Sequence, residues 1–169
     1  DFGAYASSDC KLNDLAKMVD ASLEQTLDGA AQLKMAVRQA RRILYIGDNA
    51  GECYFDRFLL EELGDKDVTY AVRGQPVLND ATREDAEAAG IHTLCPMVDT
   101  GDCTPGICLD HSSETFRSVF AESDLVIAKG QGNYESLSGR NDRAYAFLTK
   151  VKCQVLARDT GYPAGTSLV

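Results

Sequence analysis

The chain has 169 residues, of which 44% are hydrophobic and 25% are charged, a composition typical of a globular protein long enough for one well-buried domain. Its formal net charge of −9 and its lack of a long basic run argue against a nucleic-acid partner, because phosphate backbones are bound by clustered Lys and Arg. No stretch approaches the ~20 apolar residues of a membrane helix, and no signal peptide is recognisable, so we expect a cytoplasmic protein without membrane contact.

The first part of the chain predicts a helix, a strand, a second helix and a second strand. Apolar residues recur at spacings of three and four from residue 8 to residue 39, with an interruption at 27–29, and this period is typical of an amphipathic helix. The run Ile43–Ile46 is β-branched and apolar, which predicts a buried strand. A helix over residues 51–63 and a strand over residues 68–72 follow.

The second part continues this alternation. In chain order it predicts an extended piece at 77–78, a helix over 83–89 with a capping box from Thr82 and Asp85, a strand over 91–94 and a loop over 95–110. It then predicts a helix from Ser112 or Ser113 to about residue 120, a strand over 124–128, a helix over 143–151 and a strand over 153–157. Strands that alternate with helices form a mostly parallel sheet with helices on both faces. We therefore expect a helical N-terminal extension over residues 1–40 and one α/β domain over residues 41–169.

An acid and an amide directly follow the first expected strand. Asp48 and Asn49 would lie at the carboxyl edge of the sheet, where open α/β sheets bind ligands. Their oxygens suit Mg²⁺ or Mn²⁺, whereas the alternative is a loop in which both side chains satisfy backbone N–H groups. Glu52 and Asp56 on the next helix add negative charge at the same corner, and this favours a cation site.

Asp80 is a candidate for a further metal ligand. Since Thr82 and Asp85 already provide a capping box for the following helix, Asp80 is not needed as its cap and is available to the site. Metal ligand and turn residue are both open roles for this side chain. Two carboxylates and an amide, completed by waters and a substrate oxygen, would make an octahedral site.

A lysine and two glycines follow the strand predicted over residues 124–128. Gly130 and Gly132 allow backbone N–H groups to approach an anion beside Lys129, although a plain strand-to-helix turn with an extended lysine is the alternative. The motif is not a dinucleotide fingerprint, because Glu135 stands where the third glycine belongs, and it is not a Walker loop, because Lys129 precedes the glycines. Arg73, which ends the second strand, is a candidate for contact with a substrate anion or a solvated turn residue.

Three motifs in this order resemble the metal-dependent damage-control phosphatases, a family also known as domain of unknown function 89. The motifs are Gly47-Asp48-Asn49-Ala50-Gly51-Glu52, then Val72-Arg73-Gly74 with Pro76 and Asn79-Asp80, then Lys129-Gly130-Gln131-Gly132-Asn133-Tyr134-Glu135, and Lys152-Cys153 also fits. Motifs that occur in order are more specific than any one alone. The resemblance implies a Rossmann-like three-layer α/β/α fold and a stand-alone prokaryotic branch. It also implies a larger N-terminal helical region, of which residues 1–40 would be a remnant.

The resemblance further implies a divalent-metal-dependent hydrolysis of small phosphomonoesters, such as sugar phosphates or phosphopantetheine-like metabolites, in metabolite damage control. The family's metal ligands map onto Asp48, Asn49 and Asp80, and the expected ion is Mn²⁺ or Mg²⁺, with Co²⁺ or Ni²⁺ as alternatives. Its phosphate-binding lysine maps onto Lys129, with Asn133 nearby. Either Asp48 or a metal-bound water would attack the phosphoryl group.

Two other functions use the same predicted crevice. One is a non-catalytic module that binds a metal and a phosphorylated ligand, and the other is a nucleotide-dependent transferase. In every case the expected partner is a small phosphorylated metabolite, and the sequence indicates no particular oligomeric state.

Overall fold

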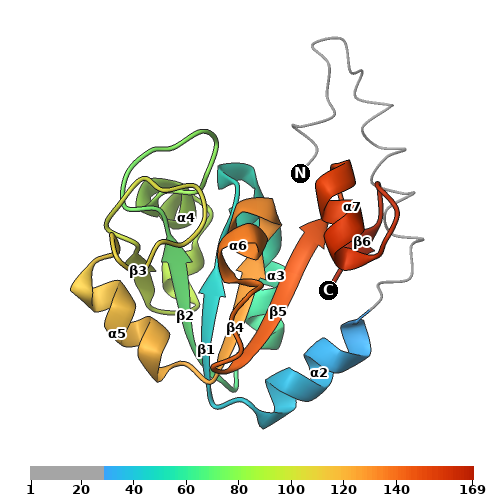
Figure 1. Cartoon of the computed structure of the whole chain (residues 1–169). Coiled ribbons are helices and arrows are strands. Elements are labelled where there is room, and N and C mark those ends of the chain that lie inside the picture. Colours follow the sequence, from blue (N-terminus) through green and yellow to red (C-terminus); the bar gives the residue numbers. More distant parts are fainter. Residues whose placement is uncertain (1–28) are drawn as a thin grey trace, which may run out of the picture.

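A six-stranded sheet forms the centre of the molecule, and the computed structural model describes residues 29–169 (Figure 1). The strands are β1 (Arg42–Ile46), β2 (Asp67–Val72), β3 (Met97–Asp99), β4 (Leu125–Lys129), β5 (Ala144–Lys150) and β6 (Ser167–Leu168). Their order across the sheet is β3-β2-β1-β4-β5-β6, and only β6 is antiparallel to its neighbour. The predicted mostly parallel sheet is confirmed.

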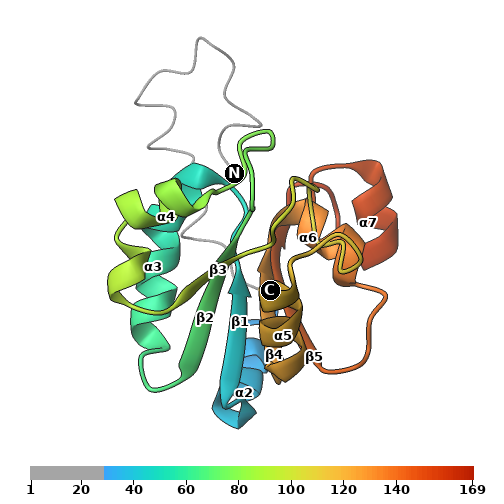
Figure 2. The ribbon, with the colours of Figure 1, turned by 90° about the vertical axis from the view of Figure 1, so that its left-hand side faces the viewer.

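Helices cover both faces of the sheet, as predicted. They are α2 (Ala30–Gln39), α3 (Cys53–Glu62), α4 (Arg83–Ala88), α5 (Glu114–Glu122), α6 (Gly130–Leu137) and α7 (Gln154–Thr160), with 3₁₀ turns at Ala50–Glu52 and Ile91–Thr93. One core cluster joins the sheet to α2, α3 and α4, and the other joins it to α5 and α6. Figure 2 shows α3 and α4 on one side of the sheet and α5 and α6 on the other. None of the described helices is long and apolar enough to cross a membrane.

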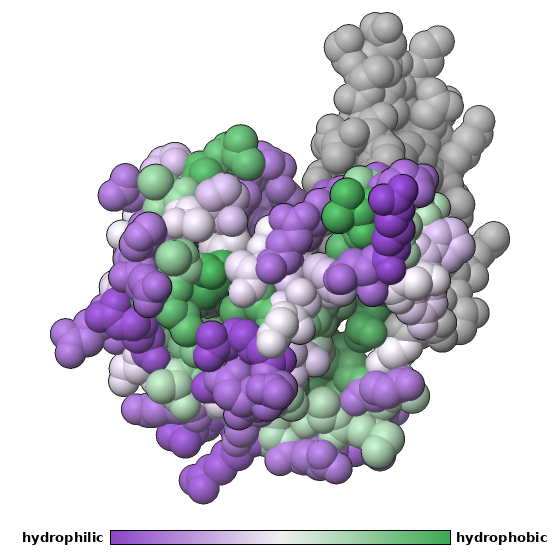
Figure 3. Space-filling view, in the orientation of Figure 1, coloured by the Kyte–Doolittle hydropathy of each residue, from purple (hydrophilic) through white to green (hydrophobic). Residues whose placement is uncertain are grey.

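The central strand β1 shows why the sequence is continuously apolar there. Ile43 and Tyr45 belong to one core cluster, whereas Leu44 and Ile46 belong to the other. A strand buried on both faces needs apolar residues at every position rather than at alternate ones. On the outside, Figure 3 shows hydrophilic residues over much of this face, with hydrophobic residues in its recesses and also at its upper rim.

The N-terminal part of the predicted helix over residues 8–39 lies outside the described residues, and its last turns are α2. Helix α2 packs on the sheet through Leu33, Ala36 and Val37. The helices expected over 51–63 and 83–89 and the helix capped by Ser113 are confirmed, and α4 has the predicted capping box. The division into residues 1–40 and 41–169 stays a prediction.

Two predictions in the middle of the chain are wrong. Residues 91–94 are not a strand: they begin with a 3₁₀ turn in which Ile91 is buried, and the third strand comes later, at Met97–Asp99, inside the predicted loop. Residues 77–78 are not extended, because Leu78 has a positive φ of 49° in a turn. A short apolar run does not distinguish a buried turn from a buried strand.

The last two elements were predicted in the wrong order. Residues 143–151, predicted as a helix, contain strand β5, and residues 153–157, predicted as a strand, lie largely in helix α7 with Cys153 as its N-cap. Helix α6 was not predicted. Pairing with β4 decides the state of β5, because strand propensity depends on tertiary context.

Candidate functional site

The predicted site residues lie at the carboxyl edge of the parallel strands, where the strand order reverses. The chain leaves β1 toward β2 on one side, while β4 pairs with the other side of β1. Asp48 follows β1, and Lys129 ends β4, so both reach the same edge (Figure 1). In doubly wound folds, ligands bind in the crevice at this switch point.

Backbone hydrogen bonds bring the loop after β2 to the loop after β1. The amide of Ala81 donates to the carbonyl of Asp48 at 2.7 Å, and the amide of Ala50 donates to the carbonyl of Asn79 at 2.9 Å. Between these bonds, Asn49 and Asp80 form an isolated antiparallel β-bridge. The three residues predicted as metal ligands therefore occupy adjoining backbone positions.

The buried Asn49 side chain links several polar groups of the site. Its Nδ2 donates to Asp48 Oδ2 at 3.0 Å and to Glu52 Oε1 at 2.6 Å. Its Oδ1 accepts a hydrogen bond of 2.5 Å from Nδ2 of Asn79. The orientation of the Asn49 amide is thus set by neighbours on both loops.

Negative charge is concentrated around Asp48. Burial, followed by the charges of Glu52 and Asp80, raises the pKa of Asp48 to about 6, while Lys152 and Arg73 act in the opposite direction. Sequence reasoning gave Lys152 no role of its own, although it lies in the Lys-Cys pair of the motif set. A carboxyl whose ionisation is opposed by other carboxylates is suited to a cation.

Gly130 lies directly against the carboxylate of Asp48. Its φ is +76°, and a Cβ atom at this position would stand 1.9 Å from Asp48 Oδ2. On the neighbouring loop, a Cβ on Gly106 would stand 2.5 Å from the carbonyl oxygen of Gly132. The glycines are therefore required because the backbone of α6 approaches two other loops closely.

Arg73 is buried and donates hydrogen bonds to three segments of the chain. Its Nε donates to Asp80 Oδ2 at 2.7 Å, its Nη1 to the carbonyl of Gly106 at 2.8 Å and its Nη2 to Asn133 Oδ1 at 2.9 Å. Only 2% of its side chain is exposed, so it is not a solvated turn residue. The arginine orients Asp80, and its predicted contact with a substrate anion stays a prediction.

Asn133 joins the start of α6 to the ends of two strands. Its Nδ2 donates to the carbonyl of Lys129 at 2.7 Å and to that of Gly47 at 3.2 Å, and the side chain is fully buried. Since Arg73 donates to its Oδ1, both the oxygen and the nitrogen of the Asn133 amide are hydrogen-bonded. Its predicted role in phosphate binding likewise stays a prediction, whereas its hydrogen bonds show that it holds the start of α6 against β1 and β4.

The ammonium of Lys129 lies between two carboxylates. Nζ donates to Glu52 Oε2 at 2.7 Å and to Asp56 Oδ1 at 2.9 Å. Burial acts to lower the pKa of Lys129, but the charges of Asp56 and Glu52 outweigh it and raise the pKa above its usual value. The lysine is therefore a cation at neutral pH, and its position is fixed by two partners on the segment formed by the 3₁₀ turn at Ala50–Glu52 and α3.

Within residues 29–169, no group of three His, Cys, Asp or Glu side chains is arranged to hold a metal ion. The predicted set differs from such a group, since Asp48 and Asp80 provide two carboxylates and Asn49 an amide. Carboxylate and amide oxygens are the ligands that a divalent cation prefers, and such a cation would stabilise the ionised form of Asp48, whose pKa is raised. The metal site stays a prediction.

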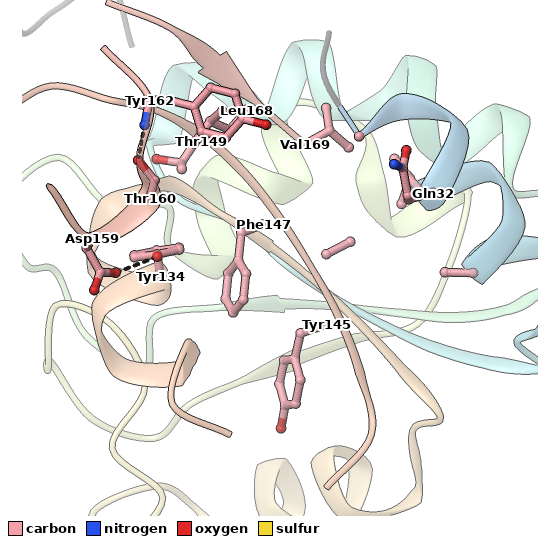
Figure 4. A pocket seen from close by; sticks show the side chains of 14 residues that line it. Gln32, Tyr134, Tyr145, Phe147, Thr149, Asp159, Thr160, Tyr162, Leu168 and Val169 are labelled. Carbon is pink, nitrogen blue, oxygen red and sulfur yellow. Dashed lines mark hydrogen bonds between the residues drawn. The ribbon is translucent and has the colours of Figure 1, made fainter. Parts of the chain in front are cut away.

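A large hollow lies beside β5, away from these residues. Its volume is about 630 Å³, and aromatic side chains such as Tyr134, Tyr145 and Phe147 line it (Figure 4). In Figure 4 the hydroxyl of Tyr134 points to Asp159, to which it donates at 2.6 Å. None of the predicted site residues lines this hollow. We place the candidate site at the carboxyl edge of β1 and β4, because the charged side chains of Asp48, Glu52 and Lys129 converge there.

Comparisons with known proteins identify relatives over the whole chain. Residues 1–168 match the model of a family described as "Damage-control phosphatase ARMT1-like domain". The chain is 39% identical, over 100% of its length, to an uncharacterized protein from Methanocaldococcus jannaschii, of which it covers 57%. It is 41% identical, over 90% of its length, to a protein from Pyrococcus horikoshii that is named a damage-control phosphatase, of which it covers 55%.

A solved structure is also similar. The crystal structure of a domain-of-unknown-function-89 family protein from Pyrococcus horikoshii aligns with a TM-score of 0.86 and 38% identity, covering 94% of this chain and 57% of that one. The chain thus spans little more than half the length of the relatives that it matches.

Proposed function

This chain belongs to the damage-control phosphatase ARMT1-like family, and on that basis we propose that it takes part in the metal-dependent hydrolysis of small phosphomonoesters. The family predicted from the three sequence motifs is confirmed by this match. Two relatives, from Pyrococcus horikoshii and Archaeoglobus fulgidus, are named damage-control phosphatases. We extend this activity to the present chain, with sugar phosphates or phosphopantetheine-like metabolites as substrates.

In this proposal, Asp48, Asn49 and Asp80 hold a divalent ion, Mn²⁺ or Mg²⁺. Arg73 bonds Oδ2 of Asp80, so an ion held by this carboxylate would use its other oxygen. When bound, such an ion neutralises phosphoryl charge and orients the substrate. Arg73 and the bridge between Asn49 and Asp80 keep the ligands in place before an ion binds.

The lysine and the start of α6 bind the phosphoryl group. Two of the three N–H groups of Lys129 are used by Glu52 and Asp56, and the third is assigned to a phosphate oxygen. The first amides of α6, at Gly130 and Gly132, have no partner within the helix and favour an anion. These donors are fixed in advance, as electrostatic stabilisation of a transition state requires.

One observation supports the proposal most strongly. The bridge between Asn49 and Asp80 joins the loops after β1 and β2 at the switch point, across which Lys129 ends β4. The predicted ligands therefore come from separate segments of the chain and meet at one edge of the sheet.

The test is a screen of phosphomonoesters with Mn²⁺ on the longest natural form of the protein. We expect turnover that Asp80→Ala abolishes and that the exposed-site control Asp110→Ala leaves intact. Unchanged turnover in Asp80→Ala would remove Asp80 from the mechanism. Calorimetry with Mn²⁺ and a sugar phosphate, run beside the screen, identifies a non-catalytic binding module by binding without turnover. A thermal shift with nucleotides alone would instead point to a transferase.

A further inference from the structure

Behind Lys129 lies a buried polar cluster that the proposed chemistry does not use directly. It consists of Asp56 on α3 and two tyrosines on the sheet, Tyr45 on β1 and Tyr70 on β2. Asp56 is 3% exposed, Tyr45 1% and Tyr70 0%. A carboxylate this deeply buried is rare in a protein core and needs a specific set of partners.

Three side chains donate hydrogen bonds to Asp56. Tyr45 donates its hydroxyl to Oδ1 at 2.7 Å, and Tyr70 donates its hydroxyl to Oδ2 at 2.7 Å. Lys129 then donates to Oδ1 at 2.9 Å. The carboxylate thus accepts three hydrogen bonds, from β1, β2 and β4, and its orientation is fixed by three strands of the sheet.

Sheet pairing explains how two tyrosines reach one carboxylate. Tyr45 and Tyr70 are partners in the parallel register of β1 and β2, and their rings stack with centroids 5.3 Å apart. Their hydroxyls therefore emerge side by side under α3. Cys53, one turn before Asp56, places its Sγ 3.5 Å from the hydroxyl of Tyr70 and packs against it.

Stability alone is a weak reason for such a cluster. Replacing a buried ion pair by apolar residues of similar volume is often neutral or stabilising, because desolvation offsets the attraction. Phenylalanines at 45 and 70 and an apolar residue at 56 would fill the same space without a buried charge. What they would not provide is a fixed anchor for the ammonium of Lys129.

We propose that Asp56 is a positioning residue, which holds the Lys129 ammonium at the edge of the crevice for a phosphoryl oxygen, and that Tyr45 and Tyr70 fix Asp56 in turn. This inference rests on the proposed function. Glu52, which is partly exposed and also bonds Asn49, holds Lys129 from the side of the metal ligands. Asp56 is the more deeply buried of the two carboxylates, so it ties the ammonium to the core.

A double-mutant cycle on phosphate binding tests the proposal. Inorganic phosphate is titrated by calorimetry, with Mn²⁺ present, into the full chain and its variants Asp56→Asn, Lys129→Met and the double variant. Since a hydrogen bond to a charged group is lost, Asp56→Asn should weaken phosphate binding by about tenfold or more and leave Mn²⁺ affinity unchanged. In the Lys129→Met background, Asp56→Asn should have no further effect, because it acts through the lysine.

A second measurement does not depend on phosphate or turnover. Acetylation of Lys129 by an amine-reactive ester, followed by mass spectrometry, should be several times faster in Asp56→Asn and in the double variant Tyr45→Phe/Tyr70→Phe, which keeps the charge of Asp56. The matched control is Tyr145→Phe, which loses a hydroxyl bond of 2.8 Å to Asp142 outside the cluster. Circular dichroism verifies that each variant is folded.

The outcomes separate the two proposals. Faster acetylation without any phosphatase activity would reject the proposed function and retain the anchoring of Lys129. Two results would overturn the positioning role of Asp56. One is a wild-type rate of Lys129 acetylation in both Asp56→Asn and the tyrosine double variant. The other is that Asp56→Asn weakens phosphate binding equally with Lys129 present and in the Lys129→Met background. If Asp56→Asn fails to fold, the tyrosine double variant decides by the same acetylation readout.

Discussion

Asn49 and Asp80 lie opposite each other in an isolated antiparallel β-bridge that connects the loops following β1 and β2. The flanking bonds from Ala81 to Asp48 and from Ala50 to Asn79 extend this connection on both sides. The two loops therefore behave as one unit, and a change in either is expected to reach the candidate metal ligands on the other.

Asn79 offers a way to test this connection from outside the predicted ligand set. Asn79 is an exposed residue, yet its Nδ2 donates a hydrogen bond that orients the amide of Asn49. We expect Asn79→Ala to weaken Mn²⁺ binding by about tenfold, as loss of a ligand-orienting contact does, with little loss of stability. Calorimetry with Mn²⁺ measures the effect, and Asn141→Ala, an exposed asparagine beyond α6, is the control. An affinity equal to that of the wild type would show that Asn49 needs no support from Asn79.

Arg73 is expected to be the most sensitive charged residue of the site for stability. Because its pair with Asp80 is buried and its guanidinium also holds Gly106 and Asn133, Arg73→Lys leaves several acceptors without a donor. The free energy of unfolding should fall by roughly 1–3 kcal/mol, the cost of leaving a buried acceptor without its donor. Urea denaturation measures it.

The control for that experiment is Arg83→Lys. Arg83 pairs with Asp99 at 3.2 Å, but both side chains are about two-fifths exposed. Exposed pairs contribute little, so the change should stay within about 0.5 kcal/mol. Similar losses in the two variants would contradict the view that burial of the Arg73 network decides its contribution.

Much of the site's location could be predicted from the sequence, since it follows from strand order. The apolar runs before Asp48 and before Lys129 identify two buried strands, and parallel strands end at one edge of a sheet. The bridge between Asn49 and Asp80 could not be predicted, because it depends on how residues 73–82 fold back onto another loop. The hydrogen bonds of Arg73 could not be predicted for the same reason, because two of its three acceptors, Gly106 and Asn133, are distant in sequence.

The last part of the chain shows where local patterns fail. Side chains of residues 144–150 alternate between the two core clusters: Tyr145 and Phe147 pack against one, and Ala146 and Leu148 against the other. Because both faces of the strand are apolar, the sequence shows no alternation of polar and apolar residues. Pairing with β4, and with β6 at its end, makes the segment a strand. Helix α7 is short, and its N-cap is Cys153, whose Sγ accepts from the amide of Leu156 at 3.5 Å. Cysteine is not among the usual capping residues, so the helix start carried no signal.

Metal binding should be visible as stabilisation. A ligand that binds only the folded state at about 100 times its dissociation constant adds roughly 2.7 kcal/mol to the free energy of unfolding. We expect Mn²⁺ to raise the melting temperature of the wild type and a chelator to reverse the shift without unfolding the protein, since Asn49, Asp80 and Arg73 are bonded to one another or to protein neighbours without an ion. Asp80→Asn should abolish the shift, whereas Asp110→Asn should retain it. A shift of equal size in Asp80→Asn would place the ion elsewhere.

Gly130→Ala should lower both the stability of the protein and the Mn²⁺ affinity of the site. The residue has φ +76°, a conformation that adds about 1–2 kcal/mol for a residue with a Cβ atom. The new methyl group would also stand 1.9 Å from Asp48 Oδ2, so the carboxylate must move. We expect a loss of stability in urea and a loss of Mn²⁺ affinity in calorimetry. Gly139→Ala is the matched control, because only its own chain neighbours lie within 4 Å of the point that its Cβ would occupy and its φ is not positive. Both quantities should therefore stay near those of the wild type. If Gly130→Ala kept wild-type Mn²⁺ affinity while losing stability, the carboxylate of Asp48 would not be a ligand in its present position.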